Sequence, residues 1–350
     1  MSIGERIRQA RKARALSQRS LAEQVGVSGM AISKYERDED VPGSRVLLDL
    51  ARALEVNVDF FLRPTSATVE PQAYRKHTAL RKKQEEAIRM RMQDWVERYL
   101  EVEGLFPDQE IAAVLPHYAV DSFGAIEQAA LELRERWNLG LDPIDNLIAL
   151  LEDRGIKVGL VSGFDDFDSC TFQVDGSPLI VTKDGLPGDR QRFNVAHELG
   201  HLVLEIGGGL NPEKAAHRFA GALLVPAEKA TFELGIRRTA LGIAELQSLK
   251  QKYGMSMQAW IYRAKDLEII SEGTATGLFR QFRAMGRNRE EPWDAYPPER
   301  PMRMERLVYR ALAEDMISRS KAQELLGEPL QQPSRGEAPQ PDELATGLGR

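Results

Sequence analysis

Two histidines and a glutamate stand close together in the segment FNVAHELGHLVLE, residues 193–205. His197 and His201 are four residues apart, and a helix advances 3.6 residues per turn, so both imidazoles project from one helix face. Two imidazoles on one face can bind one metal ion, and Glu198 can accept a proton from an attacking water. Hydrogen-bonded core histidines are the alternative, but five histidines in 350 residues make this spacing rare by chance. The pattern therefore predicts a zinc-dependent hydrolytic site.

A catalytic zinc site needs a third protein ligand and one open position for water. The extended pattern HExxHxxGxxH does not apply, because Leu204 and Gly207 stand where that pattern requires glycine and histidine. The downstream segment NPEKAAHRFAGALLVP predicts a second helix, with Glu213 and His217 one turn apart on it. Glu213 and His217 are therefore candidates for the residues that complete the zinc site.

The first 37 residues differ in charge from the rest of the chain. They contain eight lysines or arginines against three glutamates, whereas the whole chain has a formal net charge of −6. Ser17 predicts the start of one helix, Gly26 its end, and Ser28 the start of the next. A basic helix–turn–helix indicates local contact with DNA, because phosphate attracts such a surface. A helical bundle used only for protein contact is the alternative.

This segment resembles the lambda-repressor and Cro type of helix-turn-helix, also called the XRE type. The resemblance covers residues 1–62 and includes the pattern SQxxLAxxxGVSxxxISxxE. It implies a five-helix domain that binds operator DNA, and a homodimer on a palindromic site. It further implies one contact to backbone phosphate and a base-reading segment at 28–34. The residues expected to contact DNA are Gln18, Ser28, Gly29, Met30, Ser33 and Lys34.

The histidine segment resembles the ImmA/IrrE type of zinc metallopeptidase. The resemblance rests on the two histidines followed by ExxAHRFAGxLLxP, which begins at Glu213. It implies that His197, His201 and Glu213 bind Zn²⁺ and that Glu198 is the catalytic base. Ligand sets of this composition also accept Mn²⁺ or Fe²⁺. Members of this family act in bacterial regulation by cutting repressors of the helix-turn-helix type.

Two further residues have open roles. His217 either donates a hydrogen bond to a developing oxyanion or a ligand, or packs beside the site. Cys170 is the only cysteine, which excludes an intramolecular disulfide framework. A lone cysteine in a strand pattern is typical of the core, which we favour over an inhibitory zinc ligand.

The predicted fold is mainly α-helical with a small α+β domain. We expect a helix-turn-helix domain at 1–62, a linker and long helix at 63–120, a metallopeptidase domain with a short β-sheet at 121–270, a C-terminal helical region at 271–327 and a disordered tail at 328–350.

Local patterns predict the elements of the middle of the chain. The segments IKVGLV, SCTFQV and SPLIVTK predict strands, the last two joined by a hairpin turn at Asp175–Gly176. Dense charge at residues 74–106 predicts a long connecting helix with a solvated face. Residues 287–301 predict a linker or long loop.

Composition limits the possible classes of protein. A chain of 350 residues can bury two or three cores, and its negative net charge restricts DNA contact to a local surface. No run approaches the roughly 20 apolar residues of a membrane span, and the first residues lack a signal sequence. We therefore expect a soluble, cytoplasmic protein.

The combination suggests transcriptional control with an attached protease. The first hypothesis is a DNA-bound regulator whose zinc site cleaves a partner regulator or itself in a stress or signal response. The second is a regulator whose metal domain senses a ligand or metal without proteolysis. The third is an antitoxin-like interaction protein that uses the helices of residues 300–327 to hold a partner. An intact Glu198 favours the first, because a sensor needs ligands but no base.

Overall fold

The computed structural model describes residues 2–63, 67–71, 82–286, 291 and 294–330. It is mainly helical with small sheets, and the expected fold class is confirmed. The first domain consists of α1 (Ile3–Ala13), α2 (Gln18–Val25), α3 (Gly29–Glu36), α4 (Ser44–Leu54) and a 3-10 helix, η1 (Val58–Phe61).

The helix-turn-helix forms through the predicted caps. The side chains of Ser17 and Ser28 accept hydrogen bonds from the backbone N–H groups of Ser20 and Ala31, satisfying donors at the starts of α2 and α3. Gly26 ends α2 at φ 75°, a left-handed conformation that favours glycine. The fifth helix of the expected bundle is the short 3-10 helix η1.

A four-stranded sheet forms the centre of the molecule. Its order is β1 (Val69–Pro71), β4 (Ser169–Val174), β5 (Ser177–Lys183) and β3 (Lys157–Val161). The β4–β5 hairpin turns at Asp175 and Gly176, which both have positive φ as this two-residue turn requires. β3 runs parallel to β5, and β1 runs antiparallel to β4. Elsewhere β2 (Tyr118–Val120) pairs in parallel with β6 (Leu204–Ile206).

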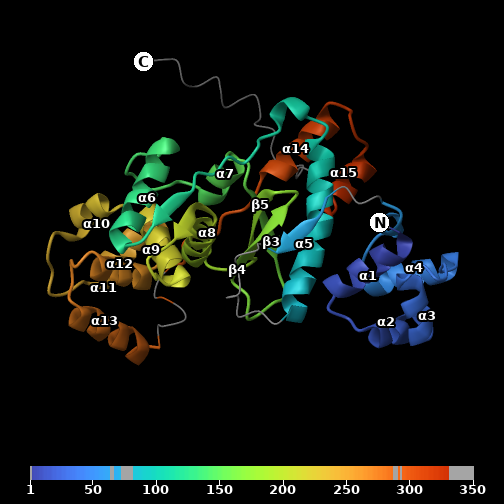
Figure 1. The fold of residues 1–350 in the computed structure, drawn as a ribbon, viewed down its shortest axis with the longest axis horizontal. Helices are drawn as coiled ribbons and strands as arrows, with labels where there is room; N and C mark the ends of the chain where they lie inside the picture. The colour runs from blue at the N-terminus through green and yellow to red at the C-terminus, as the bar shows by residue number, and fades with distance from the viewer. Residues whose placement is uncertain (1, 64–66, 72–81, 287–290, 292–293, 331–350) are drawn as a thin grey trace, which may run out of the picture.

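Helices cover both faces of this sheet (Figure 1). α5 (Lys82–Glu103) lies on one face and α8 (Gly188–Val203) on the other. Alternation along β4 explains the division: Cys170 and Phe172 pack with α5, whereas Ser169 and Thr171 face α8. Cys170 is therefore a core residue on the side of the sheet away from α8.

The helix α5 corrects the expectation of a solvated connection. It packs against the sheet through Ile88 and Val96 and against the first domain through a buried ion pair of 2.6 Å between Arg6 and Glu97. β1, in the same predicted linker segment, extends the sheet at β4. The described residues 67–71 and 82–103 thus contribute to the folded body rather than merely connecting two domains. The basic residues 74–81 lie outside the described part of the chain.

A large apolar core surrounds α8 and continues beyond residue 270. Before α8, the chain forms the short 3-10 helix η2 (Pro107–Gln109) and the helix α6 (Phe123–Arg136). The other helices are α7 (Leu147–Glu152), α9 (Pro212–Leu224), α10 (Ala227–Leu234), α11 (Ile243–Tyr253), α12 (Met257–Asp266) and α13 (Glu272–Ala284). Because Leu278 and Phe282 of α13 join this core, its packing does not stop at the expected domain boundary of 270.

The last two helices of the described chain pack against α5. α14 (Arg303–Ala313) and α15 (Arg319–Leu326) bury their apolar faces against it, so these faces are not available to hold a partner as the antitoxin-like hypothesis required. The described residues of the preceding segment, 291 and 294–301, form no helix or strand, in keeping with the predicted linker or long loop, and Glu299 fixes this loop by a buried ion pair with Arg192 of α8. Of the predicted disordered tail, residues 331–350 lie outside the described residues.

Candidate metal centre

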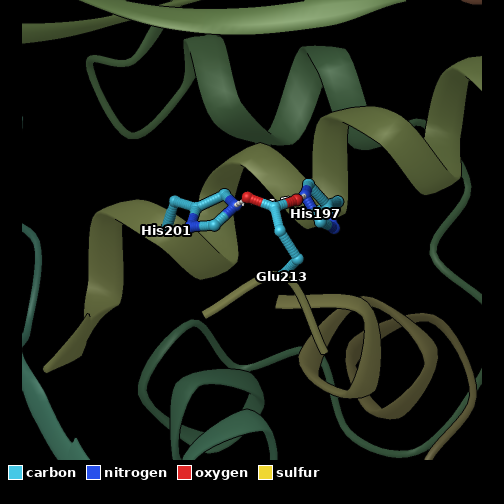
Figure 2. Close-up of side chains that lie close together, drawn as sticks. All are labelled: His197, His201 and Glu213. Carbon is cyan, nitrogen blue, oxygen red and sulfur yellow. Dashed lines mark hydrogen bonds and ion pairs between the residues drawn. The ribbon is translucent and has the colours of Figure 1, made fainter. Parts of the chain in front are cut away.

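Three side chains from α8 and α9 converge at one point (Figure 2). The Nε2 atoms of His197 and His201 are 3.1 Å apart. The two carboxylate oxygens of Glu213 lie 3.2 Å from His197 Nε2 and 3.4 Å from His201 Nε2. The figure shows the carboxylate between the two rings. In the described part of the chain, this is the cluster that can hold a metal ion.

The spacing of these donors fits a tetrahedral metal. Bonds of 2.0–2.1 Å at tetrahedral angles separate neighbouring ligand atoms by about 3.3 Å. The three separations of 3.1, 3.2 and 3.4 Å agree with that value. Two neutral imidazoles and one carboxylate are also a donor set that zinc accepts, with a fourth position left for water. The residues present therefore fit a catalytic zinc ion.

The start of α9 places Glu213. Asn211 caps this helix by accepting a hydrogen bond from the backbone N–H of Lys214, and Pro212 occupies the first helical position, where no N–H is needed. Glu213 follows in the first turn, and its side chain reaches α8.

Close packing of α8 on α9 depends on Gly200, which is not among the site residues predicted from the sequence. A Cβ atom at Gly200 would lie 3.0 Å from Phe219 Cδ1 and 3.3 Å from Ala216 Cα, both on α9. A larger side chain would push α9, and Glu213 with it, away from the histidines. A glycine inside a helix costs about 1 kcal/mol relative to alanine, and this cost is the signal by which the sequence could have revealed the close approach.

We expect Gly200→Leu to weaken zinc binding by about tenfold or more, because overpacking would displace the third ligand. Competition with a chromophoric chelator measures the affinity. Gly221→Ala is the matched control, since a Cβ at that helical glycine would make only an ordinary contact, 3.5 Å from Arg263 Cδ. Equal zinc affinity in Gly200→Leu and the wild type would disprove the positioning role.

Glu198 directly follows His197 on α8, and its side chain is held by the sheet. Its oxygens accept hydrogen bonds from Ser169 Oγ at 2.9 Å and Thr171 Oγ1 at 2.7 Å. The side chain is 4% exposed. Both hydroxyls come from β4 and were not predicted as site residues. Their spacing of two residues in a strand is the pattern that could have identified them.

His217 lies next to the predicted ligands without joining them. Its ring centroid is 4.5 Å from that of His197 and 5.6 Å from that of Phe193. Loss of solvation lowers the pKa of the His217 imidazole, against the opposing effect of the Glu213 and Asp266 carboxylates. A neutral ring near pH 7 retains one N–H donor, so both a hydrogen-bonding and a packing role remain compatible with the geometry.

Five of the six residues predicted to contact DNA lie on α3 or at its cap, and Gln18 lies at the start of α2. Gly29, Met30 and Lys34 are exposed on α3, with Met30 at 66%, and Ser33 is partly exposed. Ser28 is the exposed cap of this helix.

Gln18, which we expect to contact DNA backbone phosphate, also forms a hydrogen bond within the first domain. Its Nε2 donates to Glu36 at 2.8 Å. Arg11 binds both oxygens of the same buried carboxylate, so this cluster ties α1 and α2 to the end of α3.

Comparison with known proteins identifies two domains. Residues 7–61 match the family model described as helix-turn-helix, and residues 152–265 match the model of the IrrE N-terminal-like domain. The chain joins these two domain types, which confirms the predicted fusion. Among the described helices, none has the length and apolar character needed to cross a membrane.

The similar curated proteins match the first domain. Repressor protein C2 of Salmonella phage P22 is 44% identical over 61 residues, covering 17% of this chain and 28% of the repressor. The HTH-type transcriptional regulator ImmR of Bacillus subtilis is 34% identical over 62 residues, covering 18% of this chain and 49% of that regulator. The chain thus spans less than half the length of each of these relatives.

Two solved structures of the P22 repressor are also similar. The solution structure of its DNA-binding domain is 44% identical and covers 18% of this chain and 82% of that domain, with a TM-score of 0.18. The crystal structure of the repressor with a synthetic operator is 43% identical and covers 17% of this chain and 92% of the repressor chain, with a TM-score of 0.17.

Proposed function

For a chain that joins a helix-turn-helix domain to an IrrE N-terminal-like domain, we propose a bacterial DNA-binding transcriptional regulator with a zinc-dependent endopeptidase activity. The regulator acts in the cytoplasm as a homodimer and cleaves a repressor-type protein, or itself, in a stress or signal response. The observation that carries the proposal is the convergence of His197, His201 and Glu213 at zinc-ligand spacing beside Glu198. DNA binding is supported by the match of residues 7–61 to the helix-turn-helix family model and by the similarity of this domain to the P22 repressor, 44% identical over 61 residues.

The proposed hydrolysis assigns a proton-transfer role to Glu198. Zinc, when bound, supplies a Lewis acid that polarises the scissile carbonyl and lowers the pKa of water. Glu198 accepts the proton of the attacking water and delivers it to the leaving amine. The hydroxyls of Ser169 and Thr171 orient the carboxylate, and each oxygen keeps a second lone pair for the water. The His217 ring is close enough to His197 to take part in stabilising an oxyanion.

The ligand-sensing alternative has one observation in its favour. Glu198 is almost completely buried, and each of its oxygens already accepts a hydroxyl hydrogen bond. A metal domain that only senses a ligand or a metal needs the three ligands but not an accessible base. The two functions differ in one measurable property: only the peptidase requires the acidity of Glu198.

We expect Lys34→Ala to weaken operator binding by about tenfold, because an exposed cation on α3 is positioned to contact DNA. Ser33→Ala should relax discrimination between operator variants. An operator selected from genomic fragments and a gel shift at fixed salt give the measurement. Lys214→Ala, an exposed lysine outside the first domain, is the control. Intact operator affinity after deletion of residues 1–62 would exclude the DNA-binding assignment.

A further inference from the structure

A cavity of about 550 Å³ lies at the junction between the first domain and the rest of the molecule. The first domain contributes residues of α1 and of the segment following α4, and the opposite wall comes from α5 and the end of β3. The volume falls within the range of about 300–1,000 Å³ that small-molecule sites occupy. Part of the lining is apolar, including Leu54, Met92 and Trp95.

Among the described charged groups that line this junction cavity, one arginine forms no ion pair. Its lining includes Arg14, Arg91 and Arg98 but only Glu55 and Asp94 as acids. Arg14 binds both oxygens of Glu55. Arg98 pairs with Asp94, which a second arginine outside the lining also approaches. Arg91 forms no ion pair among the described residues, although the Glu55 carboxylate attracts it from a longer distance and its guanidinium lies over the Phe164 ring, 4.8 Å from the centroid.

The guanidinium of Arg91 is fixed but not saturated. Its Nε donates to the carbonyl of Ala13 at 3.0 Å, and its Nη1 donates to the carbonyl of Ser162 at 2.7 Å. These bonds hold the group between the two halves of the molecule. Nη2 has no partner among the described residues. Partial burial and the nearby Arg14 lower the pKa of Arg91 against the opposing effect of Glu55, and a bound anion would add to that opposing effect.

A second donor at the cavity also lacks a partner. Gln9 is 2% exposed, and its Nε2 makes no hydrogen bond. Its Oε1 accepts a bond from Arg6 Nη1 at 2.9 Å, which fixes the orientation of the amide. Because this Nε2 atom is itself almost completely inaccessible, Gln9 forms part of the buried wall of the cavity and does not contact a ligand.

We propose that this junction cavity binds a small amphipathic anion, a carboxylate or phosphate ester with an apolar body. The forked guanidinium of Arg91 matches either anionic group, and the apolar lining takes the body of the ligand. The ligand contacts both the DNA-binding domain and α5, so it links small-molecule binding to the placement of that domain. The site is separate from the metal centre and independent of any peptidase activity.

The test compares two fluorescent probes on the full-length protein. The anion 8-anilinonaphthalene-1-sulfonate shares its rings with N-phenyl-1-naphthylamine, which lacks the sulfonate. We expect the sulfonate to bind the wild type more tightly. Phenyl phosphate and phenylacetate should displace it, and benzylamine should not. The more effective competitor tells whether the cavity prefers phosphate or carboxylate.

Substitutions in the lining test whether the sulfonate binds in the junction cavity. Arg91→Leu should weaken sulfonate affinity by about tenfold or more, because a charge-assisted contact is lost. Ser162→Trp should weaken it by filling the cavity from an exposed lining position. Arg280→Leu, at an exposed arginine on α13, should bind like the wild type.

Two results would overturn the proposal. One is unchanged sulfonate affinity in both cavity variants. The other is equal affinity of the wild type for the two probes, which would show that no anion is recognised. If Arg91→Leu lowers the melting temperature, its sulfonate affinity reports stability as well as binding, and the result for Ser162→Trp alone tests the proposal. That substitution keeps the contact to Arg91, because Ser162 takes part only through its backbone carbonyl.

Discussion

Replacing Glu198 with glutamine should leave zinc and operator binding unchanged but lower peptide-bond cleavage by about 10²- to 10⁴-fold. Glutamine preserves the size of the side chain and leaves the three proposed ligands intact. It also keeps both contacts to β4, because the hydroxyls of Ser169 and Thr171 can accept as well as donate. What glutamine cannot do is accept the proton of the attacking water. The variant therefore separates the peptidase from the ligand sensor.

The cleavage measurement is made in cells, where the native target is present. Transcripts and fragments of regulators are compared between the wild type and Glu198→Gln under DNA damage, oxidants and nutrient shifts. Glu205→Gln, at an exposed glutamate on β6, is the control. If Glu198→Gln restored every response lost in a deletion strain and no regulator fragment appeared, the peptidase function would be abandoned in favour of the sensor.

Zinc content should fall from about one ion per chain to a small fraction when His197→Ala and Glu213→Ala are combined. Removing two of three ligands should cost more than the roughly 10- to 100-fold that the loss of a supporting residue costs in metal affinity. Elemental analysis after gel filtration gives the stoichiometry. Stoichiometric zinc with unchanged affinity in the double variant would exclude this ligand set.

His217→Ala provides the matched control for that experiment. Its ring lies beside that of His197, but it is not one of the three converging groups. We expect this variant to keep about one zinc per chain. Loss of zinc in His217→Ala would make His217 a ligand and would require revision of the role of Glu213.

Much of the fold follows from patterns that span only a few residues. Helix caps at Ser17 and Ser28 and a left-handed glycine at Gly26 are local chemistry, and the structure has them where the sequence predicts them. The turn at Asp175–Gly176 is local for the same reason. The pairing of His197 with His201 needs only the period of a helix. Such features depend on near neighbours in the chain and so can be inferred without knowledge of the packing.

Contacts between distant segments could not be inferred in this way. Glu213 meets the histidines only because Gly200 lets α8 and α9 approach closely, and Glu198 finds its partners in a strand that precedes it by nearly 30 residues. The charges of α5 looked like a solvated surface, yet one of them, Glu97, is buried against Arg6 of the first domain. Nothing local distinguishes a charge that faces water from one that meets an opposite charge 91 residues away, because burial is a property of the packed elements.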